Sequence, residues 1–282
     1  MQKALVILSY NHPLLTQFCL ESVLATQERE QFFDRLFLVH NGSSIENRNW
    51  LMAKFPQFEH LILEENRHFS GGANFGLKHA AQSCEWILFL SNDIEIHSFP
   101  RLPQNHGLHS PQILRRQTQH LDSWGATLNL TKAYLRHIKS FNPKLPPLGF
   151  NQKFYVPGAA FWIDRETLAI TQGFDEKLGS YWEDVDLSLR ADLHSIPLGR
   201  VEGGEIRHKI GKTCHKKIDY TLFYFQRNRR LICWRYCPVF LRPILAIYLC
   251  ISWTQTTMNL VKKKRWKDLS VFRRALPWDF FR

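Results

Sequence analysis

The stretch from Trp86 to Ile96 places the tightest limit on the fold of this chain. Five consecutive apolar residues are followed at once by Ser91, Asn92 and Asp93, and Glu95 comes two positions later. An unbroken apolar run of this length is typical of a parallel strand that is buried on both faces. Because ligands bind at the carboxyl edge of such sheets, Asp93 is a candidate for a metal or phosphate site. The competing interpretation is that Asp93 caps a turn and Glu95 is solvated.

Shorter apolar runs before this stretch repeat the same pattern. Residues 4–8, 36–39 and 61–63 are apolar, and each run ends in a polar segment. Helices are predicted to follow over 14–26 and 49–55, and a further helix is expected before Trp86. These strand, loop and helix units predict a Rossmann-like α/β half whose polar loops share one sheet edge.

A glycine cluster, Gly71, Gly72 and Gly76, lies one helix before the acidic strand. We interpret it as a glycine-rich turn that lets the backbone approach an anion at the start of the following helix. It has the spacing neither of the dinucleotide fingerprint nor of the Walker loop, so a purely structural turn is the alternative.

The second half of the chain contains a second group of acids. After a predicted hairpin over 128–138, residues 154–165 read as one strand in which Gly158 leaves room for close packing. Glu183, Asp184 and Asp186 fall in the first turn of a helix that is predicted to begin at residue 183. Burial there would raise the pKa of a carboxylate towards that of a general base. The alternative is helix capping, because the helix dipole stabilises acids in a first turn.

Basic residues are concentrated in the last quarter of the chain. The net charge is +12 overall, and residues 207–282 contain 18 Lys and Arg against 3 Asp and Glu. A helix is predicted over 220–236, and an apolar segment over 238–261 leads into the basic run 262–265. We predict that residues 220–282 form a helical extension to a domain over 1–219, and that the extension lies in an anionic membrane interface. A core helix pair or a homodimer interface is the alternative.

The cysteines and the first residues of the chain indicate where in the cell the protein is expected. Six cysteines are scattered without a metal-ligand spacing, although Cys233 and Cys237 are four apart on a predicted helix. The chain opens on a strand-like run with no signal segment before it. Reduced thiols and a cytoplasmic location, peripheral on the inner face of the cytoplasmic membrane, are therefore expected.

Taken in order, the motifs resemble glycosyltransferase family 2 over roughly residues 1–237. The segments that carry the resemblance are Val6–Asn11, Val39–Ser43, Ser70–Gly76, Leu90–Asp93, Gly173–Glu176, Glu183–Leu187 and His208. The resemblance implies a nucleotide-sugar-binding glycosyltransferase A-type fold. The branch that is most similar contains bacterial rhamnosyl- and galactofuranosyltransferases of surface polysaccharides.

The resemblance also implies roles for individual residues. Asp93 matches a ligand of a divalent metal, Mg²⁺ or Mn²⁺, and His208 matches a histidine that serves the same metal or the diphosphate. Asp184 matches the base that deprotonates the acceptor hydroxyl, with Glu183 beside it. The residues that match the nucleotide-sugar cradle are Ser9, Tyr10, Asn11, Asn41, Gly72, Asn74 and Asn92.

The expected activity is transfer, with inversion, of a sugar from a dTDP- or UDP-linked donor to a glycan or lipid-linked acceptor. Two positions depart from the family pattern. Ser91 stands where the first acid of the Asp-x-Asp motif is expected, and His40 stands where an Asp near the nucleobase is common. A donor-binding protein with impaired catalysis is therefore one alternative. A basic nucleic-acid-binding module is another, but the net charge of −3 over residues 1–206 argues against it.

Overall fold

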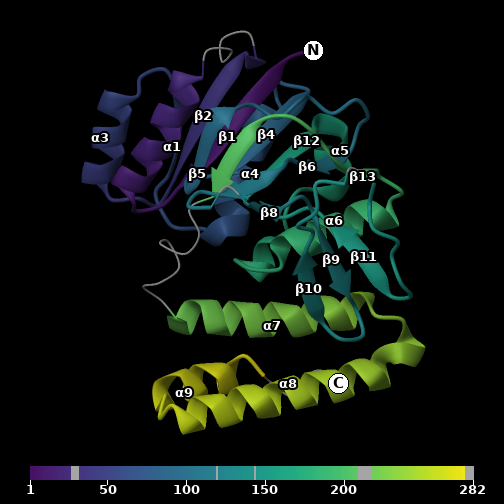
Figure 1. The fold of residues 1–282 in the computed structure, drawn as a ribbon. Coiled ribbons are helices and arrows are strands. Elements are labelled where there is room, and N and C mark those ends of the chain that lie inside the picture. The colour runs from purple at the N-terminus through teal and green to yellow at the C-terminus, as the bar shows by residue number, and fades with distance from the viewer. Residues whose placement is uncertain (27–31, 119, 143, 209–217, 277–282) are drawn as a thin grey trace.

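The computed structural model describes residues 1–26, 32–118, 120–142, 144–208 and 218–276, and its centre is a seven-stranded sheet (Figure 1). The strand order is β13-β6-β12-β4-β1-β2-β3. In chain order these strands are β1 (Lys3–Ser9), β2 (Arg35–Asn41), β3 (Glu59–Leu63), β4 (Trp86–Ser91), β6 (Leu108–Ser110), β12 (Ala160–Asp164) and β13 (Leu198–Arg200). The apolar run predicted as a buried strand is β4, which lies in the middle of the sheet with Trp86 to Leu90 buried. This prediction is confirmed.

The first four strands are parallel, so their carboxyl ends lie along one edge of the sheet. Ser91 pairs with Leu8, and Asn41 pairs with Leu63. Helices α1 (Pro13–Ala25) and α3 (Ile45–Lys54) pack on one face, and α4 (His68–Ala80) packs on the other. The Rossmann-like half is thus confirmed. Helix α3 begins earlier than predicted, because the Ser44 side chain accepts a hydrogen bond from the Asn47 N–H and caps it.

The glycine cluster does not form the predicted turn, because it lies inside helix α4. A Cβ added to Gly72 would lie 2.6 Å from the Asn41 side chain, and one added to Gly76 would lie 2.6 Å from Val6 and Val39. Glycine costs about 1 kcal/mol in a helix interior, but here it lets α4 approach β1 and β2 more closely than any side chain would allow. Tertiary packing therefore overrides the local preference for a turn.

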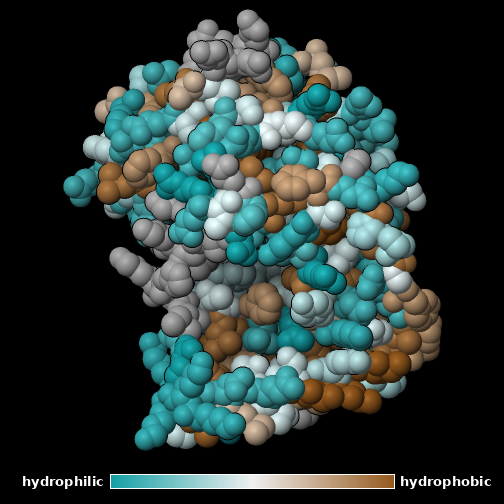
Figure 2. Space-filling model, in the orientation of Figure 1, coloured by the Kyte–Doolittle hydropathy of each residue, from teal (hydrophilic) through white to brown (hydrophobic). Residues whose placement is uncertain are grey.

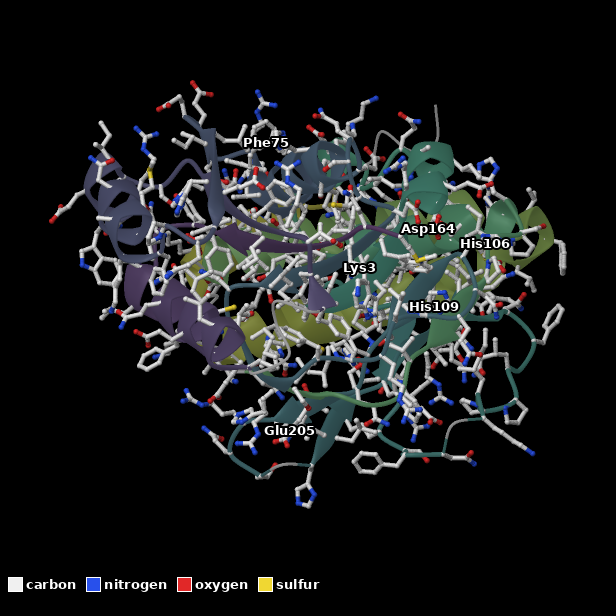
Figure 3. All side chains as sticks on the ribbon, turned by 90° about the horizontal axis from the view of Figure 1, so that it is seen from above. Lys3, Phe75, His106, His109, Asp164 and Glu205 are labelled. Atoms are coloured by element: carbon white, nitrogen blue, oxygen red, sulfur yellow. The ribbon has the colours of Figure 1, made fainter. Side chains whose placement is uncertain are left out.

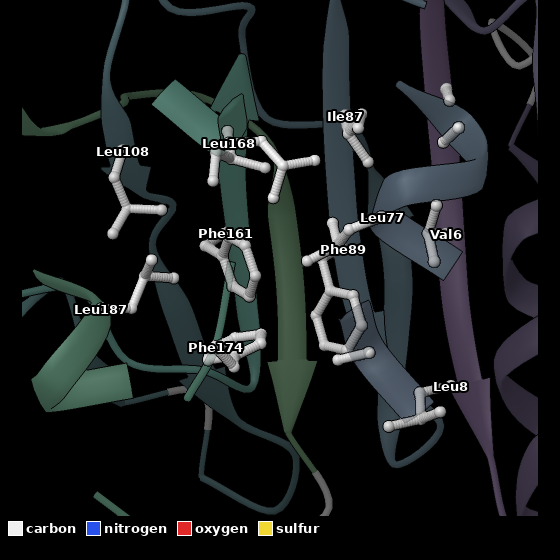
Figure 4. Close-up of a cluster of buried hydrophobic side chains, with 14 of the residues drawn as sticks. Val6, Leu8, Leu77, Ile87, Phe89, Leu108, Phe161, Leu168, Phe174 and Leu187 are labelled. Atoms are coloured by element: carbon white, nitrogen blue, oxygen red, sulfur yellow. The ribbon is translucent and has the colours of Figure 1, made fainter. Parts of the chain in front are cut away.

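The face of the sheet under α4 contains one of the main hydrophobic clusters (Figure 4). Phe89 of β4 and Phe161 of β12 stack with ring centroids 5.0 Å apart, and Phe174 meets Phe161 edge to face. Leu187, from the helix that carries the second group of acids, belongs to the same cluster. This cluster fixes that helix against the sheet near the ends of β4 and β12.

The predicted strand over 154–165 is in fact two strands in two sheets. Strand β11 (Gln152–Tyr155) joins β9 (Ala126–Asn129) and β10 (Tyr134–His137) in a three-stranded sheet, while β12 belongs to the central one. The hairpin predicted over 128–138 is confirmed as the β9–β10 pair. Pro157 separates β11 from β12, since proline offers no N–H to a strand ladder. The backbone of Gly158 is thereby available to a side chain.

A four-stranded sheet completes the α/β part. Its order is β5-β14-β7-β8, with β5 (Ile94–Ser98), β14 (Glu205–His208), β7 (Ile113–Arg115) and β8 (Leu121–Ser123).

A polar cluster lies at the other edge of the central sheet, where β4 begins. Asp164 pairs with Trp86 and lies near His106 and His109 (Figure 3). Asp164 accepts hydrogen bonds there from the Thr167 N–H and hydroxyl and from the Gly107 N–H, so this polar cluster has a structural role at the start of α5 (Arg165–Thr171).

Three helices form the carboxyl-terminal part of the described chain, below the sheets in Figure 1. They are α7 (Ile218–Tyr236), α8 (Arg242–Lys262) and α9 (Trp266–Arg274), with a short 3-10 turn, η2 (Val239–Leu241), between the first two. Val185 and Leu189 of α6 (Glu183–Leu193) share one hydrophobic cluster with Ile232 of α7 and Leu245 of α8. The helical extension is therefore packed directly on the helix that carries the second group of acids.

Candidate functional site

Asp93 and His208 form an ion pair at the carboxyl edge of the central sheet. The Asp93 Oδ2 lies 3.2 Å from the His208 Nε2, because β5 and β14 pair next to this edge. Burial acts to raise the pKa of Asp93, but the hydrogen bond and charge of His208, with the Ser91 hydroxyl, outweigh it and lower the pKa. The pKa of His208 is raised, because Asp93 and the charge of Asp122 outweigh the effect of burial.

Ser91, which replaces the first expected acid, donates a hydrogen bond to the Asp93 Oδ1 at 2.5 Å. The Glu95 carboxylate contacts side chains other than Asp93 and His208. It forms an ion pair with the Arg116 Nε at 2.8 Å and lies 3.4 Å from the His97 Nε2. Ser91 therefore orients the Asp93 carboxylate, and Glu95 does not take the place of the missing acid.

Asp184 lies close to the end of β4, although it is far from Asp93 in the sequence. The Ser91 N–H donates to the Ala159 carbonyl at 2.8 Å, and the neighbouring Gly158 N–H donates to the Asp184 Oδ2 at 2.9 Å. A Cβ on Gly158 would lie 3.3 Å from the Asp184 Cβ, so the small residue permits this approach. The two-residue segment Gly158–Ala159 thus connects the acid after β4 with the acid on α6.

Glu183 and Asp184 are adjacent carboxyl groups in a poorly solvated environment. Burial raises the pKa of Glu183 well above its usual value, and the charge of Asp184 raises it further. Burial also raises the pKa of Asp184, although hydrogen bonds from the Gly158 and Val185 N–H groups oppose this by stabilising the carboxylate. Glu183 therefore holds a proton to higher pH than a solvated carboxyl group, and Asp184 is the member of the pair that the backbone stabilises in its charged form.

Replacing Glu183 by Gln is expected to stabilise the fold, increasingly so as the pH rises. A carboxyl group whose folded pKa is raised lowers stability once the pH exceeds its unfolded pKa, whereas Gln carries no such cost. We expect a gain on the order of 1 kcal/mol, or about 2 °C or more in Tm, near pH 8 and a smaller one near pH 5. Thermal unfolding at both pH values measures it. A difference that grows as the pH falls would contradict this assignment.

The turn before α6 is held in an uncommon conformation. Tyr181 and Trp182 are consecutive non-glycine residues with φ angles of 66° and 70°. Left-handed backbone is unfavourable for bulky residues and persists only where surrounding contacts enforce it. Here the Asn228 Nδ2 of α7 lies 2.7–3.0 Å from the carbonyl oxygens of Leu178, Ser180 and Tyr181. The Asn228 side-chain amide, on the helical extension, therefore fixes the turn that precedes Asp184.

Asp186 has a different role from its neighbours in the same helical turn. It is fully buried and accepts hydrogen bonds from the Arg190 Nε at 2.7 Å, and from the Arg235 Nη1 and the Tyr236 hydroxyl, both at 2.9 Å. Two of these partners lie on α7. Asp186 therefore joins α6 to the extension, away from any chemistry at Asp184.

The residues expected to cradle the donor divide into two groups by exposure. Ser9 and Asn92 are buried, and both bond the Thr16 hydroxyl, at 2.8 Å and 2.9 Å. Tyr10 and Asn11 are exposed at the end of β1. The Asn11 Oδ1 accepts from the Ser44 N–H at 3.0 Å, which aligns the loops after β1 and β2.

Asn41, Gly72 and Asn74 are also buried, and the side-chain amides of Asn41 and Asn74 form hydrogen bonds within the protein. The Asn41 amide donates to the His68 carbonyl at 2.7 Å and accepts from the Arg67 N–H at 2.9 Å. Asn74 bonds both backbone groups of Phe174, at 2.8 Å and 2.9 Å. These residues shape the loops around the sheet edge, and a direct contact of any cradle residue with a donor stays a prediction.

His40, at the position where an acid was expected, is completely buried. Its Nε2 lies 2.9 Å from the His60 Nδ1, and burial lowers its pKa to about 4. Sequence reasoning also missed Asp122 and His137. The charge of Asp122 helps to raise the pKa of His208, and the charge of His208 contributes to lowering the pKa of His137. Neither residue lies in a recognisable motif, so no sequence signal identifies them.

Comparisons with known proteins show what this chain is similar to. Residues 4–103 match the family model described as "Glycosyl transferase family 2", a segment that holds β1 to β5 and Asp93. Over these residues the chain is similar to glycosyl transferase family 2. A search of curated protein sequences gives no match to this chain.

Solved structures show a similar fold beyond residues 4–103. Staphylococcus aureus TarS in complex with UDP-GlcNAc matches with a TM-score of 0.57 and 14% identity, over 98% of this chain and 82% of that one. The Pyrobaculum calidifontis mannosyltransferase in complex with GDP-Man and Mn²⁺ matches with a TM-score of 0.54 and 13% identity, over 97% and 73%. GalNAc-T7 with UDP, GalNAc and Mn²⁺ matches with a TM-score of 0.57 and 12% identity, over 73% of this chain but only 43% of that one. These likenesses confirm the glycosyltransferase A-type fold.

Proposed function

We propose that this chain transfers a sugar from a nucleotide diphosphate donor to a hydroxyl group of a glycan or lipid-linked acceptor, with inversion at the anomeric carbon. The observation that carries the proposal is the link through Gly158 and Ala159, which brings Asp184 close to the Asp93–His208 pair. Such a reaction needs one group that stabilises the negative charge of the leaving diphosphate and another that removes a proton from the acceptor hydroxyl. The two ends of this link supply one group of each kind.

Asp184 fits the role of the base. Gly158 and Val185 hold its carboxylate through backbone N–H groups at 2.9 Å and 2.8 Å, and its pKa is raised by burial. A raised pKa strengthens a carboxylate as a proton acceptor while it stays ionised near neutral pH. With Asp184 as the base, the acceptor hydroxyl attacks the anomeric carbon directly, and such a single displacement inverts its configuration.

Asp93 and His208 fit a divalent cation, Mg²⁺ or Mn²⁺. Within the described part of the chain, no cluster of three or more His, Cys, Asp or Glu side chains could hold a metal by itself. Cations that bridge nucleotide phosphates commonly take one or two protein ligands and complete their coordination with phosphate oxygens and water. A bound cation would neutralise the negative charge on the leaving diphosphate. Two of the similar structures contain Mn²⁺.

The class of donor and the biological setting extend the same proposal. A dTDP- or UDP-linked sugar and a role in bacterial surface polysaccharide synthesis agree with the resemblance of the motifs. Ser91 supports a second candidate, a protein that binds the donor without turnover, because its hydroxyl stands where the first acid was expected.

A panel of sugar nucleotides, tested with and without Mn²⁺ by thermal shift, examines the proposal. Saturation at about a hundred times Kd stabilises a protein by about 2.7 kcal/mol, so we expect the correct donor to raise Tm by about 5 °C or more. Asp93→Asn should remove the part of the shift that depends on Mn²⁺. If no sugar nucleotide shifts Tm, the proposal fails, and a shift without turnover on any acceptor would favour the second candidate.

A further inference from the structure

Helix α8 exposes a continuous apolar face. Phe240 is 72% exposed, Ile247 is 60% exposed and Ile251 is 49% exposed. Ile244, Ile247, Ile251 and Met258 are three, four and seven residues apart, and such spacings place side chains on one side of a helix. The exposed apolar residues of η2 and α8 are Val239, Phe240, Ile244, Ile247, Tyr248, Ile251, Met258 and Val261. A soluble surface rarely gathers this many large apolar side chains.

The opposite side of α8 is part of the protein core. Leu245 and Leu249 are buried in the cluster that contains Ile232 of α7, and the Arg229 Nη1 donates to the Ser252 hydroxyl at 2.8 Å. By length and composition alone, residues Val239–Lys262 could cross a membrane. Crossing would break these contacts with α7, whereas lying in the plane of a surface would keep them. The packing therefore favours the in-plane arrangement.

A basic cluster follows the apolar face. Lys262, Lys263 and Lys264 are exposed at the end of α8, and Arg273 and Arg274 are exposed at the end of α9. Trp266, at the junction of the two helices, is 61% exposed. Figure 2 shows hydrophobic surface over the start of α8 and hydrophilic surface towards its end and α9. Exposed apolar residues beside Lys, Arg and Trp match the interfacial zone of a bilayer with anionic lipids.

We propose that the outer face of η2, α8 and α9 is a docking surface for an anionic lipid bilayer, such as the inner face of a cytoplasmic membrane, with α8 lying in its plane. A second copy of this chain fits less well, because residues 207–282 carry a net charge of +15 and paired copies would bring these charges together. A nucleic acid would use the basic cluster but leave Ile247 and Ile251 in water. The proposal does not rest on the proposed enzymatic function.

Co-sedimentation of the full chain with vesicles tests the proposal. The chain should bind vesicles of mixed phosphatidylcholine and phosphatidylglycerol at least about tenfold more tightly than vesicles of phosphatidylcholine alone, since several basic residues meet anionic lipid. High salt should release the bound protein, because it screens the charges. Retention in high salt and in alkali would show a membrane-spanning helix and overturn the in-plane arrangement.

Matched variants locate the surface. Ile251→Glu should weaken binding to anionic vesicles about tenfold or more, as should replacement of Lys262, Lys263 and Lys264 together by Gln. Ile170→Glu is the control, because Ile170 is 44% exposed on a helix of the catalytic domain, close to the 49% of Ile251. Equal binding by Ile251→Glu and the control would overturn the proposal. A dimer in sedimentation velocity that Ile251→Glu dissociates, without vesicle binding by the parent, would assign the face to a second copy and would also overturn it.

Discussion

Asp184→Asn is expected to lower the rate of sugar transfer by at least about a hundredfold while leaving donor affinity within a few-fold. The amide keeps the size of the side chain, and its oxygen can still accept the N–H of Gly158, which donates to the Asp184 Oδ2 at 2.9 Å. It cannot take up the proton of the acceptor hydroxyl. The loss should therefore appear in kcat, because the donor contacts expected at Asp93 and His208 do not involve this residue.

Initial rates with the donor that the thermal-shift panel identifies measure this effect, and donor titrations on the same samples measure affinity. Asp192→Asn is the control, since Asp192 lies on the same helix but is exposed and pairs with Lys153 on the surface. Equal rates for the two variants would refute the role of Asp184 as base. Nuclear magnetic resonance of the product provides an independent check, because a retained anomeric configuration would exclude single displacement.

Asp186→Ala should cost about 3 kcal/mol of folding free energy, the lower end of the range for breaking a buried ion pair. Asp186 is completely buried, and its loss leaves Arg190, Arg235 and Tyr236 without their shared acceptor. The cost is moderated because the Arg235 side chain is 47% exposed and can be solvated. For a chain of this size, the expected fall in Tm is about 6 °C or more.

Thermal and urea unfolding of Asp186→Ala and Asp192→Ala test this prediction side by side. The surface ion pair of Asp192 should contribute within about 1 kcal/mol. Similar stability of both variants would show that Asp186 does not hold α6 to α7. Donor binding that survives in Asp186→Ala below its Tm would separate this structural role from the chemistry at Asp184.

Much of the amino-terminal fold could be predicted from the sequence, because its signals are local. The apolar run Trp86–Leu90 is typical of a strand covered on both faces, and the parallel order of β1 to β4 follows from the repeated strand, loop and helix units. The glycines of α4 misled prediction, since their reason is a 2.6 Å approach to Val6, Val39 and Asn41 that only the folded chain reveals.

The candidate site was less accessible to sequence reasoning. The motifs nominated Asp93, Asp184 and His208, and the pair formed by Asp93 and His208 could be anticipated only through the resemblance. The three acids that begin α6 look alike in the sequence. Burial and partners distinguish Glu183, with a raised pKa, from Asp184, a carboxylate stabilised by backbone N–H groups, and from Asp186, the centre of a buried ion pair. The long-range partners lie in the segment before β12 and on α7. Such long-range contacts leave no local pattern.

The contact between Asn228 and the strained turn at Tyr181 and Trp182 means that the α/β part and the helical extension are not structurally independent. A truncation at residue 219 would remove Asn228, whose side-chain amide restrains the backbone carbonyls of Leu178, Ser180 and Tyr181 in the turn before α6. The shortened protein would then lose the placement of Asp184 even if its central sheet still forms. The same helices that form the outer face of the molecule therefore complete the interior next to α6.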